Sequence, residues 1–379
     1  MASTLNVLNI YKTYFPDPPG GLQEAIRQIC LTTSRVGIQN TIFTLTPNLD
    51  QKILEFPEAK VVREKSWWAP ASCDISGPTS LKTYAELTKR TDVIHFFYPW
   101  PYADLLNLLV PSKKPKVLTY ISDVVQQKFL NKLYAPLMWH TLHQMDVIVA
   151  NCEAYAQTSP ILSHPSIRNK VRIIPLGIDE SSYPAASELM PTSPSELASL
   201  SAGEPYFLFI GVHRYYKGLH TLIKASMLCK AKVLIAGSGP KTAELKNLAS
   251  QMGASNVVFL GQVSDAEKMS LIAGCRALIL PSHLRSEAYG MVLVEASIMG
   301  KPMISCEIGT GTSFVNLDGQ TGIVIPPESE SKLAEAMNLL LNDSMLAAQM
   351  GDCARKRYEE NFSGIVLGES YANLFKELA

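Results

Sequence analysis

The chain has 379 residues, 47% hydrophobic and 18% charged, which is an ordinary globular composition but a length that usually divides into two cores. Lys and Arg together number 34, as do Asp and Glu, and this balance argues against a nucleic-acid-binding protein. The scattered cysteines include no CxxC pair, so the sequence predicts no disulfide framework or zinc ribbon and favours a reducing, cytoplasmic location.

The first half of the chain alternates short apolar runs with amphipathic segments. The runs predict strands at residues 5–10, 41–45, 93–97, 117–121, 147–150 and 171–175. Between them, residues 21–36 and 123–145 are typical of helices. Buried strands that alternate with helices indicate an α/β domain with a parallel sheet. The N-terminus lacks the charged-then-apolar order of a signal peptide, and no apolar run approaches the ~18 residues of a membrane span.

A Ser-, Pro- and Ala-rich stretch at 179–205 interrupts this rhythm and is typical of a linker. A second alternating series follows, with strands at 206–210, 232–236, 257–260, 277–280, 302–305 and 322–325 and helices beginning near 217, 241, 265 and 290. We therefore predict a domain at 1–180, a linker at 181–205 and a second α/β domain at 206–360. Ligands of such sheets bind at the carboxyl ends of the strands, so two facing domains would form a site in the cleft between them.

The segment 281–300, PSHLRSEAYGMVLVEASIMG, combines a strand end, a polar loop and a helix that begins near Gly290. The free N–H groups of a helix start can bind an anion. Eight helical residues between Glu287 and Glu295 would separate the carboxylates by about 12 Å, enough for one to reach a sugar and the other a ribose. The alternative is that Glu295 packs within the helix and Glu287 is a surface charge.

Three other loops carry residues suited to phosphate. Arg214 and Lys217, in FIGVHRYYKG, could stabilise a diphosphate leaving group or belong to a solvated loop. Gly237 and Gly239 form a turn in VLIAGSGP, but Thr242 stands where a dinucleotide fingerprint needs a third glycine, so a dehydrogenase is disfavoured. Gly20-Gly21 opens a helix and permits close approach of a ligand, or is simply a tight turn.

The spacing Glu287-x7-Glu295 resembles the E-x7-E motif of the retaining glycosyltransferase family 4, and Gly211-x5-Lys217-Gly218 resembles that family's G-x5-K-G segment. The resemblance implies a GT-B fold, in which two Rossmann-like α/β domains with parallel sheets face a central cleft. It implies that the tail, 361–379, is a closing helix that crosses back to the first domain. It also implies that Glu295 hydrogen bonds the donor ribose and that Glu287 contacts the donor hexose. Further donor contacts implied by the resemblance are the backbone at Tyr289, Gly290 and Met291 near the diphosphate, Gln262 and Val263 at the base, Gly237 and Gly239 near the nucleotide, and Gly20 and Gly21 facing the donor phosphate.

The chain departs from the family pattern at its histidines. DVIHFFYPWPYADL resembles an HxHxP-type strand end that keeps His95 but carries Phe97 in the second position. VLTYISDVVQQKF resembles an HSD strand end in which Ile121 replaces the histidine before Ser122 and Asp123. The resemblance places His95, Ser122 and Asp123 on the acceptor side, with Asp123 as the polar group that compensates for Ile121. Many members also carry Arg where this chain has Val212, a charge that Arg214 would supply.

The resemblance implies retaining transfer of a hexose, with Glu287, Lys217, Arg214 and Asp123 as the catalytic set. Arg214, Lys217 and the helix start would take the place of a metal, so we expect neither metal nor cofactor besides the nucleotide-sugar substrate. GVHRYYKG and GTGTSFVN look most like bacterial mannosyl- or rhamnosyltransferases of surface polysaccharides. GDP-mannose is the favoured donor, a UDP-sugar the alternative, and a lipid-linked saccharide the expected acceptor. The rival hypotheses are a degenerate, non-catalytic subunit, favoured by Ile121 and Val212, and another GT-B activity such as an epimerase or a phosphorylase.

The segment VVREKSWWAP combines cations and indole rings at Arg63, Lys65, Trp67 and Trp68. Such a cluster suits a lipid interface and predicts peripheral contact with the inner face of the cytoplasmic membrane. The more common alternative is that the tryptophans fill a gap in the core.

Overall fold

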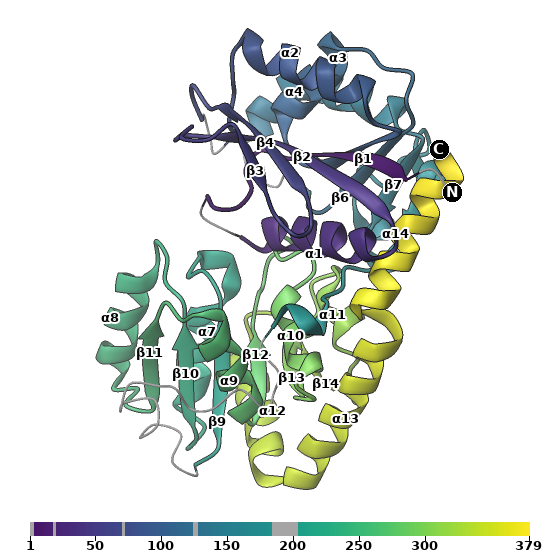
Figure 1. Ribbon diagram of the computed structural model, residues 1–379. Coiled ribbons are helices and arrows are strands. Elements are labelled where there is room, and N and C mark those ends of the chain that lie inside the picture. The colour runs from purple at the N-terminus through teal and green to yellow at the C-terminus, as the bar shows by residue number, and fades with distance from the viewer. Residues whose placement is uncertain (1–3, 18–19, 70–72, 124–127, 184–203) are drawn as a thin grey trace. The chain divides into compact units, whose positions relative to one another are not determined.

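The computed structural model describes residues 4–17, 20–69, 73–123, 128–183 and 204–379. These residues form two compact units (Figure 1). The first comprises residues 1–179 together with the C-terminal segment 364–379, and the second comprises residues 180–363. Most of the expected linker, residues 184–203, lies outside the described residues. Just before it, Glu180–Ser182 form a short 3-10 helix that belongs to the second unit.

The first unit is built on an eight-stranded sheet with the order β3-β4-β2-β1-β5-β6-β7-β8. All neighbouring strands are parallel except β3 and β4, which run antiparallel at one edge. The sequence predicted purely parallel sheets, and the antiparallel pair of β3 and β4 shows that this prediction is wrong at one edge. Its strands are β1 (Leu5–Ile10), β2 (Ile38–Thr46), β3 (Ile53–Glu55), β4 (Lys60–Lys65), β5 (Val93–Tyr98), β6 (Lys116–Tyr120), β7 (Val147–Ala150) and β8 (Val171–Ile173), and its helices are α1 (Gly21–Arg35), α2 (Pro78–Lys89), α3 (Pro101–Leu109), α4 (Lys128–Gln144), α5 (Glu153–Thr158) and α14 (Gly364–Leu378).

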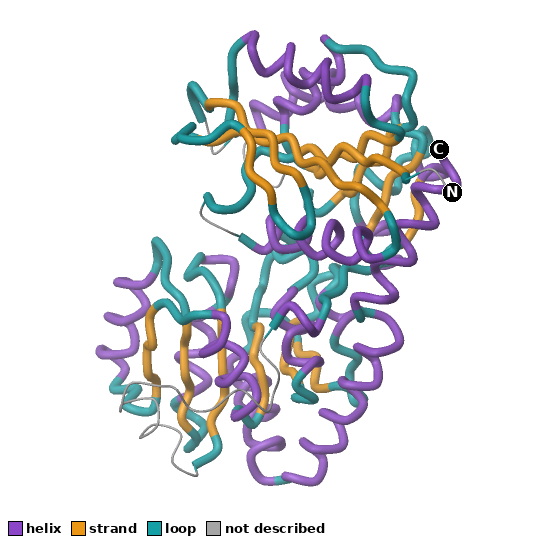
Figure 2. Tube along the Cα trace, in the orientation of Figure 1, coloured by secondary structure: helices purple, strands orange, loops and turns teal. Residues whose placement is uncertain are grey.

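Helices cover both faces of this sheet, which explains why its central strands are apolar throughout. Helices α2, α3 and α4 lie on one face and α1 on the other (Figures 1 and 2). Every residue of β5 and β6 is buried, as expected for parallel strands packed on two sides. Helix α14 packs along α1, and a Cβ atom at Gly368 would lie only 2.8 Å from the carbonyl oxygen of Thr32. The C-terminal helix is therefore part of the first unit's core.

The second unit carries a six-stranded sheet, order β11-β10-β9-β12-β13-β14, in which all neighbours are parallel. Helix α7 packs against α8 and α12, whereas α10 packs against α9 and α13. Its strands are β9 (Tyr206–Ile210), β10 (Lys232–Ala236), β11 (Val257–Gly261), β12 (Ala277–Leu280), β13 (Met303–Cys306) and β14 (Gly322–Ile325), and its helices are α7 (Leu219–Ser226), α8 (Thr242–Met252), α9 (Asp265–Gly274), α10 (Met291–Ile298), α11 (Thr312–Val315), α12 (Glu330–Asn342) and α13 (Ser344–Asn361).

No helix among the described residues is both long enough and apolar enough to span a bilayer.

Candidate functional site

The loops that follow β9, β10 and β11 meet at the carboxyl edge of the second sheet. These strands are parallel neighbours, so their following loops share one edge. The backbone N–H of His213 donates to the Ser238 carbonyl oxygen at 3.1 Å, and the Gln262 side chain donates to the Ser238 hydroxyl at 2.6 Å. The loops after β9, β10 and β11, which the sequence analysis singled out separately, are thus linked by hydrogen bonds.

The glycine turn after β10 is required by packing. A Cβ atom at Gly239 would lie 2.7 Å from both the backbone N and O of His213, which is too close for any other residue without a shift of the loop. The His213 ring is buried, and its Nδ1 lies 2.9 Å from the Thr242 hydroxyl oxygen. The turn at Gly237 and Gly239 therefore holds the β9 loop in place, whatever it also contributes to a ligand.

Lys217 and Glu287 form an ion pair in this region. Lys217 Nζ lies 2.5 Å from Glu287 Oε2, and the lysine side chain is only 13% exposed. The Ser282 hydroxyl donates to the same carboxylate oxygen at 3.0 Å. Gly218 makes the approach possible, because its left-handed conformation (φ 70°) and lack of a Cβ let the turn touch the Pro281 carbonyl.

The charge of Glu287 keeps Lys217 protonated despite its burial. Burial alone lowers the pKa of Lys217, but the negative charge and hydrogen bond of Glu287 hold the net pKa above its ordinary value. Arg214 is exposed at the start of the short 3-10 helix Tyr215–Lys217. Its positive charge acts on the pKa of Lys217 in the opposite direction to that of Glu287. The two cations are therefore near one another, and Lys217 is the one held in a fixed position.

Glu295, the second glutamate of the pair, is buried within α10 and bound by residues that sequence reasoning missed. The Tyr183 hydroxyl donates to Glu295 Oε1 at 2.7 Å, and Lys268 Nζ donates to the same oxygen at 2.8 Å. Lys268 also lies 2.9 Å from Asp265 and 4.8 Å from the centre of the Tyr183 ring. Only the i,i+3 spacing of Asp265 and Lys268 could have been noticed from sequence, because Glu295 and Tyr183 lie far away in the chain.

The start of α10 is held by the loop after β13. Gly290 caps the helix in a left-handed conformation, and Met291 is its first residue. The Gly311 N–H donates to the Ala288 carbonyl at 2.9 Å, and Arg285 Nη1 donates to the Gly309 carbonyl at 2.7 Å. The Tyr289 side chain is buried, and Val263 is half-buried.

His95 lies in the core of the first unit, which corrects its expected place on the acceptor side. It is 0% exposed. Its ring nitrogens lie 3.0 Å from Asn9 Oδ1 and 2.7 Å from the Thr119 hydroxyl oxygen. Burial lowers its pKa to about 3, so the ring is neutral and already hydrogen bonded. Its position in β5 suits packing under α14, where Tyr371 and Phe375 contact it.

Asp123 follows β6 and accepts hydrogen bonds from two hydroxyl groups. Tyr120 donates at 3.1 Å and Ser159 at 2.6 Å, both to Asp123 Oδ1. Ile121 and Ser122 beside it are half-buried. The structure thus places a fixed, partly exposed carboxylate at this strand end and an apolar side chain two residues before it.

Gly20 and Gly21 are exposed at the start of α1. The Gly20 N–H donates to the Gln23 side chain at 3.1 Å, and a Cβ atom at Gly21 would meet nothing within 4 Å. Packing against the described residues therefore does not require a glycine at position 21.

The two tryptophans after β4 lie at the surface, so the alternative that they fill a gap in the core is wrong. Trp67 is 66% exposed and Trp68 70%. Of the two cations in the cluster, Lys65 is exposed, whereas Arg63 is buried and donates to the Gln51 carbonyl at 2.7 Å. The exposed part of the cluster is therefore Lys65, Trp67 and Trp68.

Comparison with known proteins accounts for both halves of the chain. The model of "Glycosyltransferase Family 4" matches residues 19–182, and that of "Glycosyl transferases group 1" matches residues 197–357. The O-antigen chain mannosyltransferase C of Escherichia coli is 38% identical over 374 residues, covering 99% of each chain. The chain belongs to glycosyltransferase family 4. The D-rhamnosyltransferase WbpZ of Pseudomonas aeruginosa is 40% identical over 359 residues, covering 95% of this chain and 92% of that one.

Solved structures of other glycosyltransferases share the fold of this family 4 member. Sucrose-phosphate synthase from Thermosynechococcus elongatus aligns with a TM-score of 0.80 at 19% identity over 99% of both chains. Anabaena Alr3699/HepE in complex with UDP aligns with a TM-score of 0.79 at 17% identity over 99% of this chain and 100% of that one. The two α/β units therefore have the GT-B fold that the motifs implied.

Proposed function

We propose that this glycosyltransferase moves mannose, or a closely related deoxyhexose, from a GDP-sugar to a lipid-linked saccharide during synthesis of an O-antigen chain. The observation that carries the proposal is similarity over almost the full length of both chains to relatives named as an O-antigen mannosyltransferase and a D-rhamnosyltransferase. A UDP-sugar is the alternative donor, since HepE, which shares the fold, was solved with UDP and UDP-glucose.

The second unit would bind the donor at the carboxyl edge of its sheet. Lys217 and the N-terminus of α10 would stabilise the diphosphate, with Arg214 as an exposed second cation. Glu287 would contact the hexose, and Glu295 the ribose. Gly237, Gly239, Gln262 and Val263 would surround the nucleotide. The ion pair of Lys217 with Glu287 supports this arrangement, because it couples the phosphate-binding cation to the sugar-binding carboxylate.

Transfer would retain the configuration of the donor sugar. The acceptor hydroxyl attacks the anomeric carbon on the face from which the diphosphate leaves, and the bond from that carbon to phosphate oxygen breaks. The departing phosphate oxygen takes the acceptor proton, so no second catalytic carboxylate is needed, in contrast to retaining glycoside hydrolysis. The growing negative charge would be stabilised by Lys217 and Arg214 without a divalent metal.

The acceptor would bind near Ser122 and Asp123, with Gly20 and Gly21 facing the donor phosphate. Asp123 supports this proposal, because it offers a fixed carboxylate two residues after Ile121, where related chains have a histidine. A lipid-linked acceptor would be met at the inner face of the cytoplasmic membrane. The exposed Trp67 and Trp68 beside Lys65 support peripheral contact there.

A panel of donors tests this function. Transfer of radiolabelled sugar to lipid-linked saccharides would be measured with GDP-mannose, GDP-rhamnose, UDP-glucose and UDP-N-acetylglucosamine, each with and without a chelator. We expect product only from a GDP-sugar, with the anomeric configuration of the donor retained and with no loss of transfer in the chelator. Product from a UDP-sugar alone, or transfer that a chelator abolishes and magnesium restores, would contradict the proposal.

A further inference from the structure

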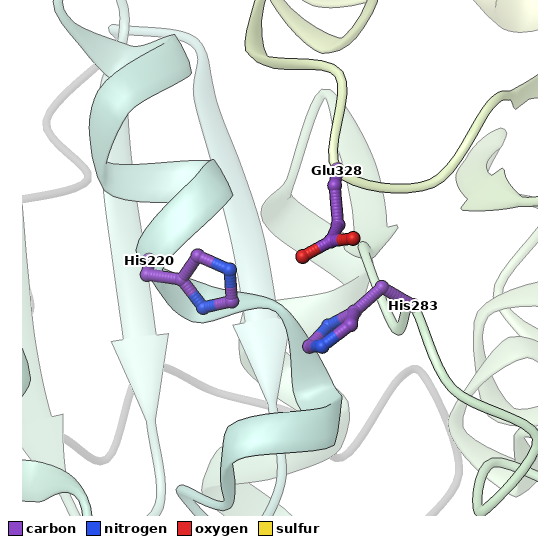
Figure 3. A group of neighbouring side chains, drawn as sticks. All are labelled: His220, His283 and Glu328. Carbon is purple, nitrogen blue, oxygen red and sulfur yellow. The ribbon is translucent and has the colours of Figure 1, made fainter.

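A cluster of two histidines and a glutamate lies in the second unit, apart from the residues assigned above. His220 comes from α7, His283 from the loop after β12, and Glu328 from the turn before α12 (Figure 3). One ligand atom from each residue lies within 4.8 Å of the others. Within the part of the chain that the structure describes, this is the one group of three or more His, Cys, Asp or Glu side chains with such spacing.

His283 is a buried polar side chain without a hydrogen-bond partner. It is 7% exposed, and neither Nδ1 nor Nε2 has a partner among the described residues. Leaving a buried polar group unpaired costs about 1–3 kcal/mol, and a bound ion is one established explanation for such a group. The ring is held in place from its backbone, since the His283 N–H donates to the Tyr216 carbonyl at 3.0 Å.

Tyr215 packs against both histidines. Its ring stacks on that of His220 with centroids 5.4 Å apart and meets the His283 ring edge-on at 4.8 Å. The two imidazole rings are 5.2 Å apart and nearly perpendicular. The two rings do not stack, and one nitrogen of each lies near the Glu328 carboxylate (Figure 3).

Glu328 completes the donor set from an unusual backbone conformation. Its φ is 56°, and among the described residues it is the one non-glycine with a positive φ. Such conformations cost about 1–3 kcal/mol and cluster at ligand-binding positions. The side chain is exposed and points toward the two rings, so it can move to close on an ion.

We propose that His220, His283 and Glu328 bind one divalent ion of the zinc class, with a fourth position open to water. Two imidazole nitrogens and one carboxylate are a donor set that zinc takes with three protein ligands, whereas magnesium and calcium prefer oxygen ligands alone. Burial lowers the pKa of both histidines, and the neutral imidazole is the form that binds a metal.

The ion would tie α7 to the loop that carries Glu287, because Ser282 beside His283 hydrogen bonds that glutamate. The ion would lie apart from the leaving diphosphate, and the proposal does not depend on the proposed donor or acceptor. This proposal departs from the sequence-based expectation of no metal, and the three ligands come from segments far apart in the chain.

Zinc binding to the full chain, freed of any histidine tag and stripped with a chelator, tests the proposal. Zinc would be titrated in competition with a chromophoric chelator, and cobalt(II) would serve as a spectroscopic probe of the coordination geometry. We expect one zinc per chain, visible cobalt bands of a tetrahedral site, and a rise in melting temperature on adding zinc. Glu328→Gln, His220→Gln and His283→Gln should each weaken zinc binding about tenfold or more.

His140→Gln is the matched control, because His140 is exposed in α4 of the first unit and should bind zinc as wild type does. Glu328→Gln removes an exposed side chain and leaves the fold intact, so it keeps the test decisive even where His283→Gln fails to fold. Substoichiometric zinc in wild type, or equal zinc affinity in wild type and Glu328→Gln, would overturn the proposal.

Discussion

Lys217 is the cation that the candidate donor site holds most firmly, since its amine pairs with Glu287 while its side chain is almost buried. Lys217→Ala should lower kcat about 100-fold or more, because removing one preorganised charge contact at a developing anion typically costs that much. Steady-state transfer with a saturating donor measures this. Lys332→Ala, which removes an exposed lysine paired with Glu335 on α12, should leave kcat unchanged, and equal rates in both variants would contradict the assigned role.

Lys268 and Tyr183 position Glu295 by donating to the same carboxylate oxygen. Lys268→Met should therefore raise KM for the nucleotide-sugar about tenfold, with a smaller change in kcat, because Glu295 is proposed to hold the ribose rather than the reacting bond. Lys268→Arg keeps the charge and should restore most of the affinity. A loss confined to kcat, or no rescue by arginine, would place Glu295 elsewhere in the reaction.

At the level of single residues, short motifs in the sequence pointed to residues that the structure brings into contact. Lys217 was singled out by the G-x5-K-G spacing and Glu287 by the E-x7-E spacing, and the two side chains form an ion pair in the structure. Lys268 and Tyr183 could not be predicted, because their contact with Glu295 depends on how α9, α10 and the segment before 184 pack. His95 was misplaced, because a histidine at the end of an apolar strand has the same pattern whether it faces a ligand or the core.

At the level of elements, apolar runs revealed the strands that are buried on both faces. β1, β7, β9, β10, β12 and β14 have the bounds that the sequence predicted. β3 and β4 were missed, because both ends of Lys60–Lys65 and much of Ile53–Glu55 are exposed at a sheet edge. β3 is the exposed edge strand, and β4 beside it carries Arg63 and Glu64 at buried positions, so neither has the continuous apolar run that marks a central parallel strand.

The turn after β4 presents Lys65, Trp67 and Trp68 at the surface and should contact anionic lipid. The double variant Trp67→Ser with Trp68→Ser should lower binding to phosphatidylglycerol-containing vesicles about tenfold. The reason is that two large aromatic rings would no longer transfer from water into the lipid interface on binding. Co-sedimentation measures this binding. Leu109→Ser, which removes an exposed apolar side chain elsewhere in the same unit, should bind as wild type does. If the double variant binds vesicles as tightly as wild type, this turn does not contact the membrane.

At the level of the whole molecule, the repeated strand–helix alternation predicted two α/β units with separate sheets, and the structure has both. The pattern did not show which side chains of the final helix belong to the first core. Tyr371 lies 3.0 Å from the Thr119 hydroxyl oxygen, a contact between residues that no local pattern relates. A contact between residues so far apart in the chain depends on the tertiary fold, so a local sequence pattern could not predict it.

We propose that this family 4 member is an active transferase, although Ile121 stands at the histidine position of the HSD strand end that its segment resembles. A decayed site would be expected to lose its paired charges as well, yet Lys217 pairs with Glu287 and Lys268 pairs with Glu295. Asp123, which accepts hydrogen bonds from Tyr120 and Ser159, is the polar group that we propose serves the acceptor side.

Sugar transfer by wild type, Ile121→His and Asp123→Ala, compared in one radiolabelled assay with GDP-mannose and lipid-linked saccharides, tests this claim most directly. We predict transfer by wild type and a loss of about 100-fold in Asp123→Ala, since a polar contact made in the transition state would be missing. No transfer by wild type with any donor, together with transfer gained by Ile121→His, would show instead that the chain is a degenerate transferase.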